Sequence, residues 1–249
     1  MGHFKLLNVY IIVQLVLLVL LFFLFPVSIA ISDLDSSSLA TSNGYILDNS
    51  NICNAGAKGI GIHLLASDGN NVSGNYISVN RIGLCLFLSN NNTIIENTVR
   101  ENQEYGILLE RSNHNMVSKN IIEQNIYGGI SLWDSEDNLL EHDNATCNGD
   151  GISLWDSDRN NLSYNNASYN YWWGVYQFRS DKNIFIENNA SHNAENGFVF
   201  LDSRDNVLRR NTADKNQGTG GGICFYNSTP NRLAGNNALD NRYGGVRFY

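Results

Sequence analysis

A glycine that opens a short alternating segment recurs along this chain at intervals of 22 to 25 residues. In the unit that begins at Gly151, Ile152 and Leu154 share one face of a predicted strand, and Ser153 and Trp155 share the other. A fixed period of this length is typical of a solenoid, in which each repeat forms one coil and stacks on the next. The glycines are Gly61, Gly83, Gly106, Gly129, Gly151, Gly174, Gly197, Gly222 and Gly245.

Three columns of asparagine accompany the glycine. In each complete copy a serine follows the glycine by six places, the first asparagine follows the serine by three, and two more follow at intervals of five. The second column changes once, to Asp143, and the third runs unbroken from Asn80 to Asn241. Asparagine suits corners because its amide bonds nearby main chain and tolerates left-handed backbone. We therefore predict three short strands and three corners per coil, with the asparagines stacked as ladders.

The predicted core tapers around each coil. Inward positions are large in the first strand, medium in the second and mostly alanine in the third. A leucine-rich repeat has a similar period, but it needs a longer leucine framework and one asparagine per unit. The pattern instead predicts an all-β, single-domain, right-handed parallel β-helix over residues 44–249, with about nine coils of about 23 residues.

From Gly61 onward the pattern GI-x-L-x-x-S-x-x-N-x-[ILV]-x-x-N covers about three quarters of the chain. It resembles the right-handed β-helix (PbH1) repeats of NosD-like proteins and of the carbohydrate-binding and sugar-hydrolysing (CASH) domain family, in a form similar to archaeal surface proteins. The resemblance implies the fold but not one function, because the same fold carries lyases, epimerases, hydrolases and inert spikes. Copper, which the NosD name implies, needs imidazole or soft ligands, whereas the histidines here fall in different columns.

The first 30 residues are predicted to lie outside the fold. An apolar run over residues 9–25 is followed by Pro26 and a small-residue site that ends at Ala30. This pattern predicts a secretory signal peptide, with an uncleaved N-terminal membrane anchor as the alternative. Residues 31–43 are predicted to be a polar linker. Either alternative predicts a secreted or cell-surface protein.

Charge and chain ends also bear on partners. The formal net charge of −8 at pH 7 argues against nucleic acid as a partner.

The sequence ends at Tyr249, four residues after Gly245. An uncapped solenoid end exposes core side chains and strand edges, so we expect end-to-end self-association through the C-terminal coil.

An outward aromatic column is predicted four places after each glycine. Exposed aromatic surface marks binding sites, and outside a cell flat rings suit sugars. A polysaccharide or cell-surface glycan is therefore the expected partner, and a cross-coil ladder that only stabilises the sheet is the alternative. The predicted ligand-binding residues, including two tryptophans at the preceding corner, are Phe87, Trp133, Trp155, Trp172, Trp173, Phe178 and Tyr226.

The adjacent column places Asp134 and Asp156 one coil apart, between Arg111 and Arg179. One interpretation makes Asp134, Asp156 and Asp158 ligands for Ca²⁺, the one cofactor that the pattern suggests, with Arg179 near a uronate. Another makes the two stacked aspartates a retaining glycosidase pair, because coils about 4.8 Å apart approach the separation of about 5–5.5 Å that such a pair needs. A third is a salt-bridged ladder.

The leading functional prediction is an extracellular module that is carbohydrate-binding or structural. The alternative is a polysaccharide lyase or epimerase acting on acidic glycans, with Asp134, Asp156 and Arg179 as its catalytic candidates. Convergence of these three side chains in an open groove would favour the enzyme, and pairing along a flat wall would favour the module.

Overall fold

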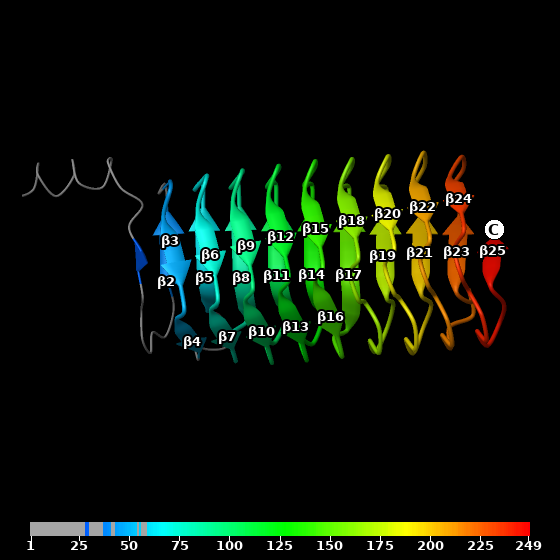
Figure 1. Cartoon of the computed structure of the whole chain (residues 1–249), viewed down its shortest axis with the longest axis horizontal. Helices are drawn as coiled ribbons and strands as arrows, with labels where there is room; N and C mark the ends of the chain where they lie inside the picture. Colours follow the sequence, from blue (N-terminus) through cyan, green and yellow to red (C-terminus); the bar gives the residue numbers. More distant parts are fainter. Residues whose placement is uncertain (1–27, 30–36, 41–42, 54, 56–58) are drawn as a thin grey trace, which may run out of the picture.

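The computed structural model describes residues 28–29, 37–40, 43–53, 55 and 59–249. Within these residues every regular element is a strand, and all strand pairs are parallel. Figure 1 shows the coils stacked side by side along the long axis, with the strands arranged in three sheets. The predicted right-handed parallel β-helix of about nine coils of about 23 residues is confirmed.

Sheet C holds the longest strands and forms one side of every coil. Its register joins residues one coil apart, so that Trp133 pairs with Trp155 and Ile130 with Ile152. In spatial order it contains β2 (Ser37–Ala40), β5 (Ile60–Leu65), β8 (Ile82–Phe87), β11 (Tyr105–Glu110), β14 (Gly128–Trp133), β17 (Asp150–Trp155), β19 (Val175–Phe178), β21 (Phe198–Leu201), β23 (Ile223–Tyr226) and β25 (Val246–Phe248).

Sheets A and B form the other two sides. Sheet A contains β1 (Ser28–Ile29), β3 (Ile46–Asp48), β6 (Asn71–Ser73), β9 (Thr93–Ile95), β12 (Met116–Ser118), β15 (Leu139–Glu141), β18 (Asn161–Ser163), β20 (Ile184–Ile186), β22 (Val207–Arg209) and β24 (Arg232–Ala234). Sheet B contains β4 (Asn51–Cys53), β7 (Tyr76–Ser78), β10 (Thr98–Arg100), β13 (Ile121–Glu123) and β16 (Asn144–Thr146). Beyond β16 the third side continues as isolated bridges, beginning with Asn144 to Asn166.

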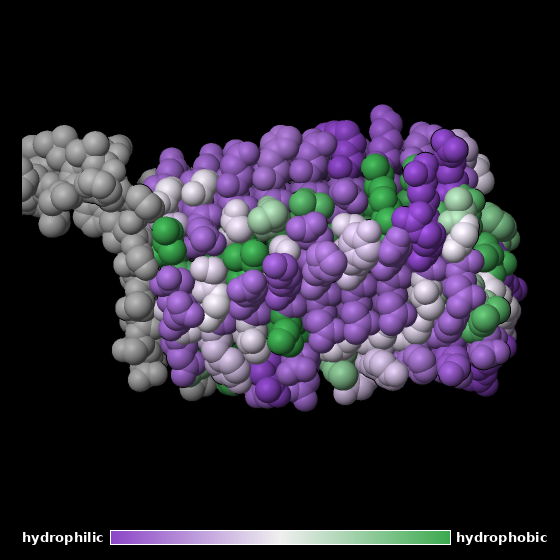
Figure 2. All heavy atoms as spheres, in the orientation of Figure 1, coloured by the Kyte–Doolittle hydropathy of each residue, from purple (hydrophilic) through white to green (hydrophobic). Residues whose placement is uncertain are grey.

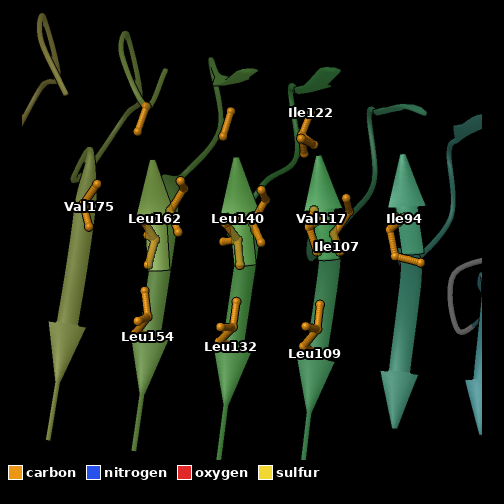
Figure 3. Packing of buried hydrophobic residues seen from close by; sticks show 14 of the residues in the cluster. Ile94, Ile107, Leu109, Val117, Ile122, Leu132, Leu140, Leu154, Leu162 and Val175 are labelled. Atoms are coloured by element: carbon orange, nitrogen blue, oxygen red, sulfur yellow. The ribbon is translucent and has the colours of Figure 1, made fainter. Parts of the chain in front are cut away.

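The core is a set of rows that run along the solenoid axis. Figure 3 shows the row Leu109, Leu132 and Leu154 facing a second row that includes Leu140 and Leu162, and all five side chains are fully buried. The predicted taper is present in the later coils, where the third side holds the buried alanines Ala145, Ala167, Ala190 and Ala213. In the earlier coils the same side holds larger buried residues, Ile52, Ile77, Val99 and Ile122. The second strand is larger than predicted in one coil, where Phe185 packs edge-on against Phe198 and Phe200.

The repeated glycine is required by the close approach of neighbouring coils. A Cβ atom on Gly151 would lie 2.5 Å from the carbonyl oxygen of Gly174 and 2.8 Å from the Cβ of Ala167. No side chain fits at that distance from backbone. The repeated glycine and the inward residue of the third side, which is alanine in the later coils, therefore meet at the same narrow corner.

The asparagine ladders form as predicted, but with one difference in backbone conformation. The backbone N–H and the Nδ2 of Asn92 both donate to Oδ1 of Asn115, at 2.8 and 3.1 Å. The left-handed residue is the one before the ladder asparagine, for example Arg159 (φ 56°) before Asn160. The ladder asparagine is needed for its bonds to the next coil rather than for a left-handed backbone.

The N-terminal boundary differs from the prediction. Ser37–Ala40, inside the predicted linker 31–43, forms β2 and pairs with β5 of sheet C. Ser28–Ile29 likewise pairs with β3. The linker prediction is therefore wrong over residues 37–40, because a parallel sheet edge bonds the backbone of any extended segment and needs no apolar pattern.

The predicted signal peptide or anchor falls almost wholly on residues 1–27 and 30, which lie outside the described residues. Across the described part of the chain, no helix is long and apolar enough to cross a membrane. At the other end, Val246 and Phe248 are 43% and 65% exposed. Figure 2 shows a mostly hydrophilic face with scattered hydrophobic side chains, some of which lie at the end formed by the C-terminal coils.

Candidate functional site

The outward column predicted from the repeat lies on sheet C. Glu110 pairs with Phe87 on one side and with Trp133 on the other, and Trp155 pairs with Phe178. Trp133 and Trp155 are each 37% exposed. Strand alternation points these side chains away from the core, so the column itself is confirmed.

The aromatic rings gather into two walls rather than one ladder. Tyr105 meets the ring of Trp133 edge-on, at 5.8 Å between centroids. Trp155 instead leans toward the following coil, where its ring lies 5.1 Å from Tyr176 and 5.6 Å from Phe178. The two tryptophans therefore lean apart, although their backbones are paired.

An open groove of about 800 Å³ lies over these strands. A second hollow of about 460 Å³ adjoins it, shares Tyr105, Glu110 and Trp133, and contains Phe87. Together the two hollows span sheet C from β5 to β17. The lining of the larger one, which we call the groove, is Tyr105, Glu110, Arg111, Trp133, Asp134, Trp155 and Asp156.

The structure brings together some of the predicted site residues and separates others. Trp133, Trp155, Asp134 and Asp156 line the groove. Phe87 lines the second hollow. Three other predicted residues line neither hollow: Trp172 is an exposed corner residue, Trp173 stacks on Tyr176, and Arg179 lies beside Asp156 one coil further on. Phe178 and Tyr226 continue the same outward column beyond the groove.

Left-handed backbone at the ends of β11, β14, β17 and β19 sets the charged rim of the groove. Arg111, Asp134, Asp156 and Arg179 all have φ between 44° and 50°. Nε of Arg111 lies 3.4 Å from Oδ2 of Asp134, and Nη2 of Arg179 lies 2.7 Å from Oδ2 of Asp156. These side chains are about half exposed or more, so each pair contributes at most about 1 kcal/mol.

The three predicted calcium ligands do not share one oxygen cage. Asp158 accepts the backbone N–H of Asp181 on Oδ1, at 2.7 Å, while Asp134 and Asp156 pair with arginines. Across the described residues, no group of three or more His, Cys, Asp or Glu is placed to hold a metal ion.

Buried polar groups beneath the groove were not predicted. Asp150 is 8% exposed and accepts the backbone N–H of Trp173 at 3.2 Å, and burial raises the pKa of its carboxyl to about 7. The hydroxyls of Ser131 and Ser153 are 2.8 Å apart. For Asp150, the signal in the sequence was its position directly before a repeated glycine. The residues at that position form a second column that faces outward.

Gly128 belongs to that second column and makes room for Tyr105. A Cβ atom on Gly128 would lie 3.3 Å from the ring of Tyr105 and 3.2 Å from the hydroxyl of Ser131. Because the glycine leaves this space, Tyr105 can lie across the coil and reach Trp133.

The stacked three-sided coils define a right-handed parallel β-helix, and the groove lies on one outer face of this helix. The chain belongs to the NosD family, because the family model described as periplasmic copper-binding protein (NosD) matches residues 29–185. A second family model, described as right-handed beta helix region, matches residues 126–249. No curated protein sequence matches the chain.

Several solved structures share the fold. The A-module of the mannuronan C-5 epimerase AlgE4 from Azotobacter vinelandii is 13% identical, with a TM-score of 0.62, over 82% of this chain and 64% of that one. The T265N mutant of the periplasmic alginate epimerase AlgG is 15% identical, with a TM-score of 0.63, over 89% of this chain and 72% of that one. The Dettilon tailspike protein is 13% identical, with a TM-score of 0.54, over 90% and 60%. The chain thus spans only part of each neighbour, and identities this low establish the fold alone.

The family description names copper, so the donor set can be tested against it. Copper sites use imidazole, thiolate or thioether ligands. His142 and His192 stack on Tyr164 and Tyr169 in different coils. Burial raises the pKa of the Cys85 and Cys224 thiols to about 12. His63 lies in register with Cys85, but no group of three or more His, Cys, Asp or Glu among the described residues is placed to hold a metal ion, so these residues do not fit a copper centre.

Proposed function

We propose that this protein binds polysaccharide in the groove on sheet C. The observation that carries the proposal is an open groove of about 800 Å³ whose two walls hold exposed tryptophans on rigid strands. Ring faces pack against the C–H faces of sugars, and strands hold the rings in place without loss of side-chain freedom on binding. Several proteins with this fold are named for action on polysaccharides, including the alginate epimerases and the pectate lyase Pel9A.

Trp155→Ala tests the proposal. We expect this variant to weaken retention on the bound glycan at least tenfold in affinity electrophoresis, because it removes one wall of the groove. Its melting temperature should change little, since Trp155 lies outside the core. Trp172→Ala is the matched control, because Trp172 is an exposed tryptophan that does not line the groove. Equal losses in both variants, or a large drop in melting temperature for Trp155→Ala, would contradict the proposal.

A lyase or epimerase acting on acidic glycans is the second candidate function. It is supported by Asp134 and Asp156 at the rim of the groove and by the epimerases and lyase that share the fold. Incubation with oligomannuronate and oligogalacturonate, followed by mass spectrometry and by NMR of the sugar ring protons, tests it. Product that disappears in Asp156→Asn would support this candidate. Pairing of both aspartates with arginines favours the binding module.

Three further predictions belong to this proposed role. Secretion or display at the cell surface is supported by the apolar run at residues 9–25 and is tested by cell fractionation. Calcium binding by Asp134 and Asp156 is tested by calorimetry at millimolar Ca²⁺. Self-association is tested by light scattering over a range of concentrations.

A further inference from the structure

The charge of the groove distinguishes between classes of glycan. Its lining holds three carboxylates, from Glu110, Asp134 and Asp156, and one guanidinium, from Arg111, so its formal charge is −2, or −1 when Arg179, which pairs with Asp156, is included. A uronate polysaccharide would bring further negative charge within about 8 Å, the distance over which charges interact at physiological ionic strength. The groove therefore repels the acidic sugars on which the alginate epimerases and pectate lyase are named to act.

The arginines around the groove do not reverse this sign, because each already has a carboxylate partner. Arg81 pairs with Glu104 at 2.7 Å, Arg111 with Asp134 at 3.4 Å and Arg179 with Asp156 at 2.7 Å. If a uronate took the place of one of these aspartates on its arginine, the displaced aspartate carboxylate would remain next to the bound uronate. The total charge around the uronate would therefore still be unfavourable to an anion.

Glu110 is the carboxylate without a cationic partner. It lies in register between Phe87 and Trp133, and in the part of the chain that the structure describes it makes no ion pair. The ring of Tyr105 stands against Trp133 and also lines the groove. An ammonium group at this point would meet a carboxylate and aromatic faces together, and a cation is attracted to the face of an aromatic ring.

A further carboxylate lies beside this wall. After burial, Glu104 is the next cause that raises the pKa of the Tyr105 hydroxyl, whereas burial keeps Asp150 largely protonated at pH 5.5. The wall of the groove thus stands in a negative field that a bound cation would relieve.

We infer that the groove binds a polysaccharide with free amino groups, a glucosamine type of glycan, with an ammonium group held between Glu110 and the rings of Tyr105 and Trp133. This inference rests on the proposed glycan binding and names its ligand class. Charge complementarity selects the amino sugar, and the aromatic walls select a sugar over a simple amine.

The experiment compares three oligosaccharides of equal length by calorimetry at pH 5.5 with the whole protein. They are de-N-acetylated glucosamine oligomers, their N-acetylated neutral counterparts and oligomannuronate. We expect the amino oligomer to bind at least tenfold more tightly than the neutral one and oligomannuronate to bind most weakly. Added salt should reduce the difference, because it screens the charges.

Two variants separate a specific site from general attraction to a protein of negative net charge. Glu110→Gln should lower the preference for the amino oligomer threefold to tenfold and leave binding of the neutral oligomer unchanged. Glu141→Gln, the same change at a half-buried outward position on sheet A, should leave the preference unchanged. Equal effects of the two variants would overturn the inference.

The remaining outcomes separate failure of the inference from failure of glycan binding itself. Binding of the neutral oligomer as tightly as the amino oligomer, or tightest binding of oligomannuronate, would overturn the amino-sugar assignment and leave the groove as a glycan site. No binding of any of the three, together with no loss in Trp155→Ala on other polysaccharides, would overturn both.

Discussion

Asp143 replaces the asparagine in the second ladder, and its environment is suited to an amide. Its Oδ1 accepts the backbone N–H and the Nδ2 of Asn120, at 2.8 and 2.9 Å. Its Oδ2 is buried and has no hydrogen-bond partner. Asn120 and Asn165, the residues on either side of Asp143 in this ladder, each donate Nδ2 to a backbone carbonyl of a neighbouring coil. A carboxylate can only accept there, so the neutral acid is favoured.

We expect Asp143→Asn to stabilise the protein at neutral pH and above. Burial is the main cause that raises the pKa of Asp143 from 3.8 to about 7, which corresponds to roughly 4 kcal/mol of stability. The folded pKa exceeds the unfolded one, so this stability is fully present below about pH 4 and is lost as pH rises to about 7. The gain in Asp143→Asn should therefore be small near pH 4, grow with pH and level off above pH 7, as measured by urea unfolding across that range.

Asp240→Asn serves as the control, because Asp240 is exposed and precedes a ladder asparagine without belonging to the column. It should change stability by less than about 0.5 kcal/mol at every pH. If Asp143→Asn also gave no gain above pH 7, the ladder would tolerate the charge, and the burial argument would be wrong.

At the scale of the strand, two adjacent glycines at the start of β14 have opposite roles. Gly129 faces the next coil, where an added Cβ would lie 2.6 Å from the carbonyl of Gly151 and 2.8 Å from Nδ2 of Asn148. Gly128 faces outward, where an added Cβ would meet only side chains, at 3.2 Å or more. One glycine maintains the coil spacing and the other makes room in the wall of the groove.

We expect Gly129→Ala to lower the free energy of unfolding by about 1–3 kcal/mol, because backbone and a ladder amide must move. Gly128→Ala should cost less than about 1 kcal/mol, since Tyr105 can turn away, but it should weaken glycan retention through that movement. Thermal unfolding of both variants, with retention assays on Gly128→Ala, measures the two effects. Similar losses of stability in the two variants would mean that the outer face is as tightly packed as the coil interface.

At the scale of the whole molecule, the solenoid protects thiols in distant coils. Cys85 and Cys224 are buried, whereas Cys147 is exposed. Burial raises the pKa of the two buried thiols to about 12, so thiolate is scarce and the sulfur is covered. Reaction at these sites requires sheet C to open locally.

We expect iodoacetamide at pH 8 to modify Cys147 at least a hundredfold faster than Cys85 or Cys224, as followed by mass spectrometry. In concentrated guanidinium chloride the three rates should converge, because the folded environment is gone. Reaction of Cys85 or Cys224 in native protein at the rate of Cys147 would mean that sheet C opens readily at that coil.

The repeat alone determined the fold and much of the surface. Side chains alternate with a period of two along a strand and return after about 23 residues. Only one register of stacked coils satisfies both periods, so the core rows, the ladders and the column containing Trp133 and Trp155 followed from position. The strands β1 and β2 at the N-terminus did not follow from the repeat. They pair with β3 and β5 through backbone hydrogen bonds, which do not require a pattern of side chains in the sequence.

Only the tertiary structure decided what the outward columns form. Trp133 and Trp155 lean apart, Tyr105 crosses the space left by Gly128, and Asp150 is buried rather than exposed. Each of these outcomes depends on the volume and charge of side chains one coil away, about 22 residues distant in sequence. Periodicity fixes the direction of a side chain from the strand, but its final rotamer and partner depend on how neighbouring coils fill the space between them.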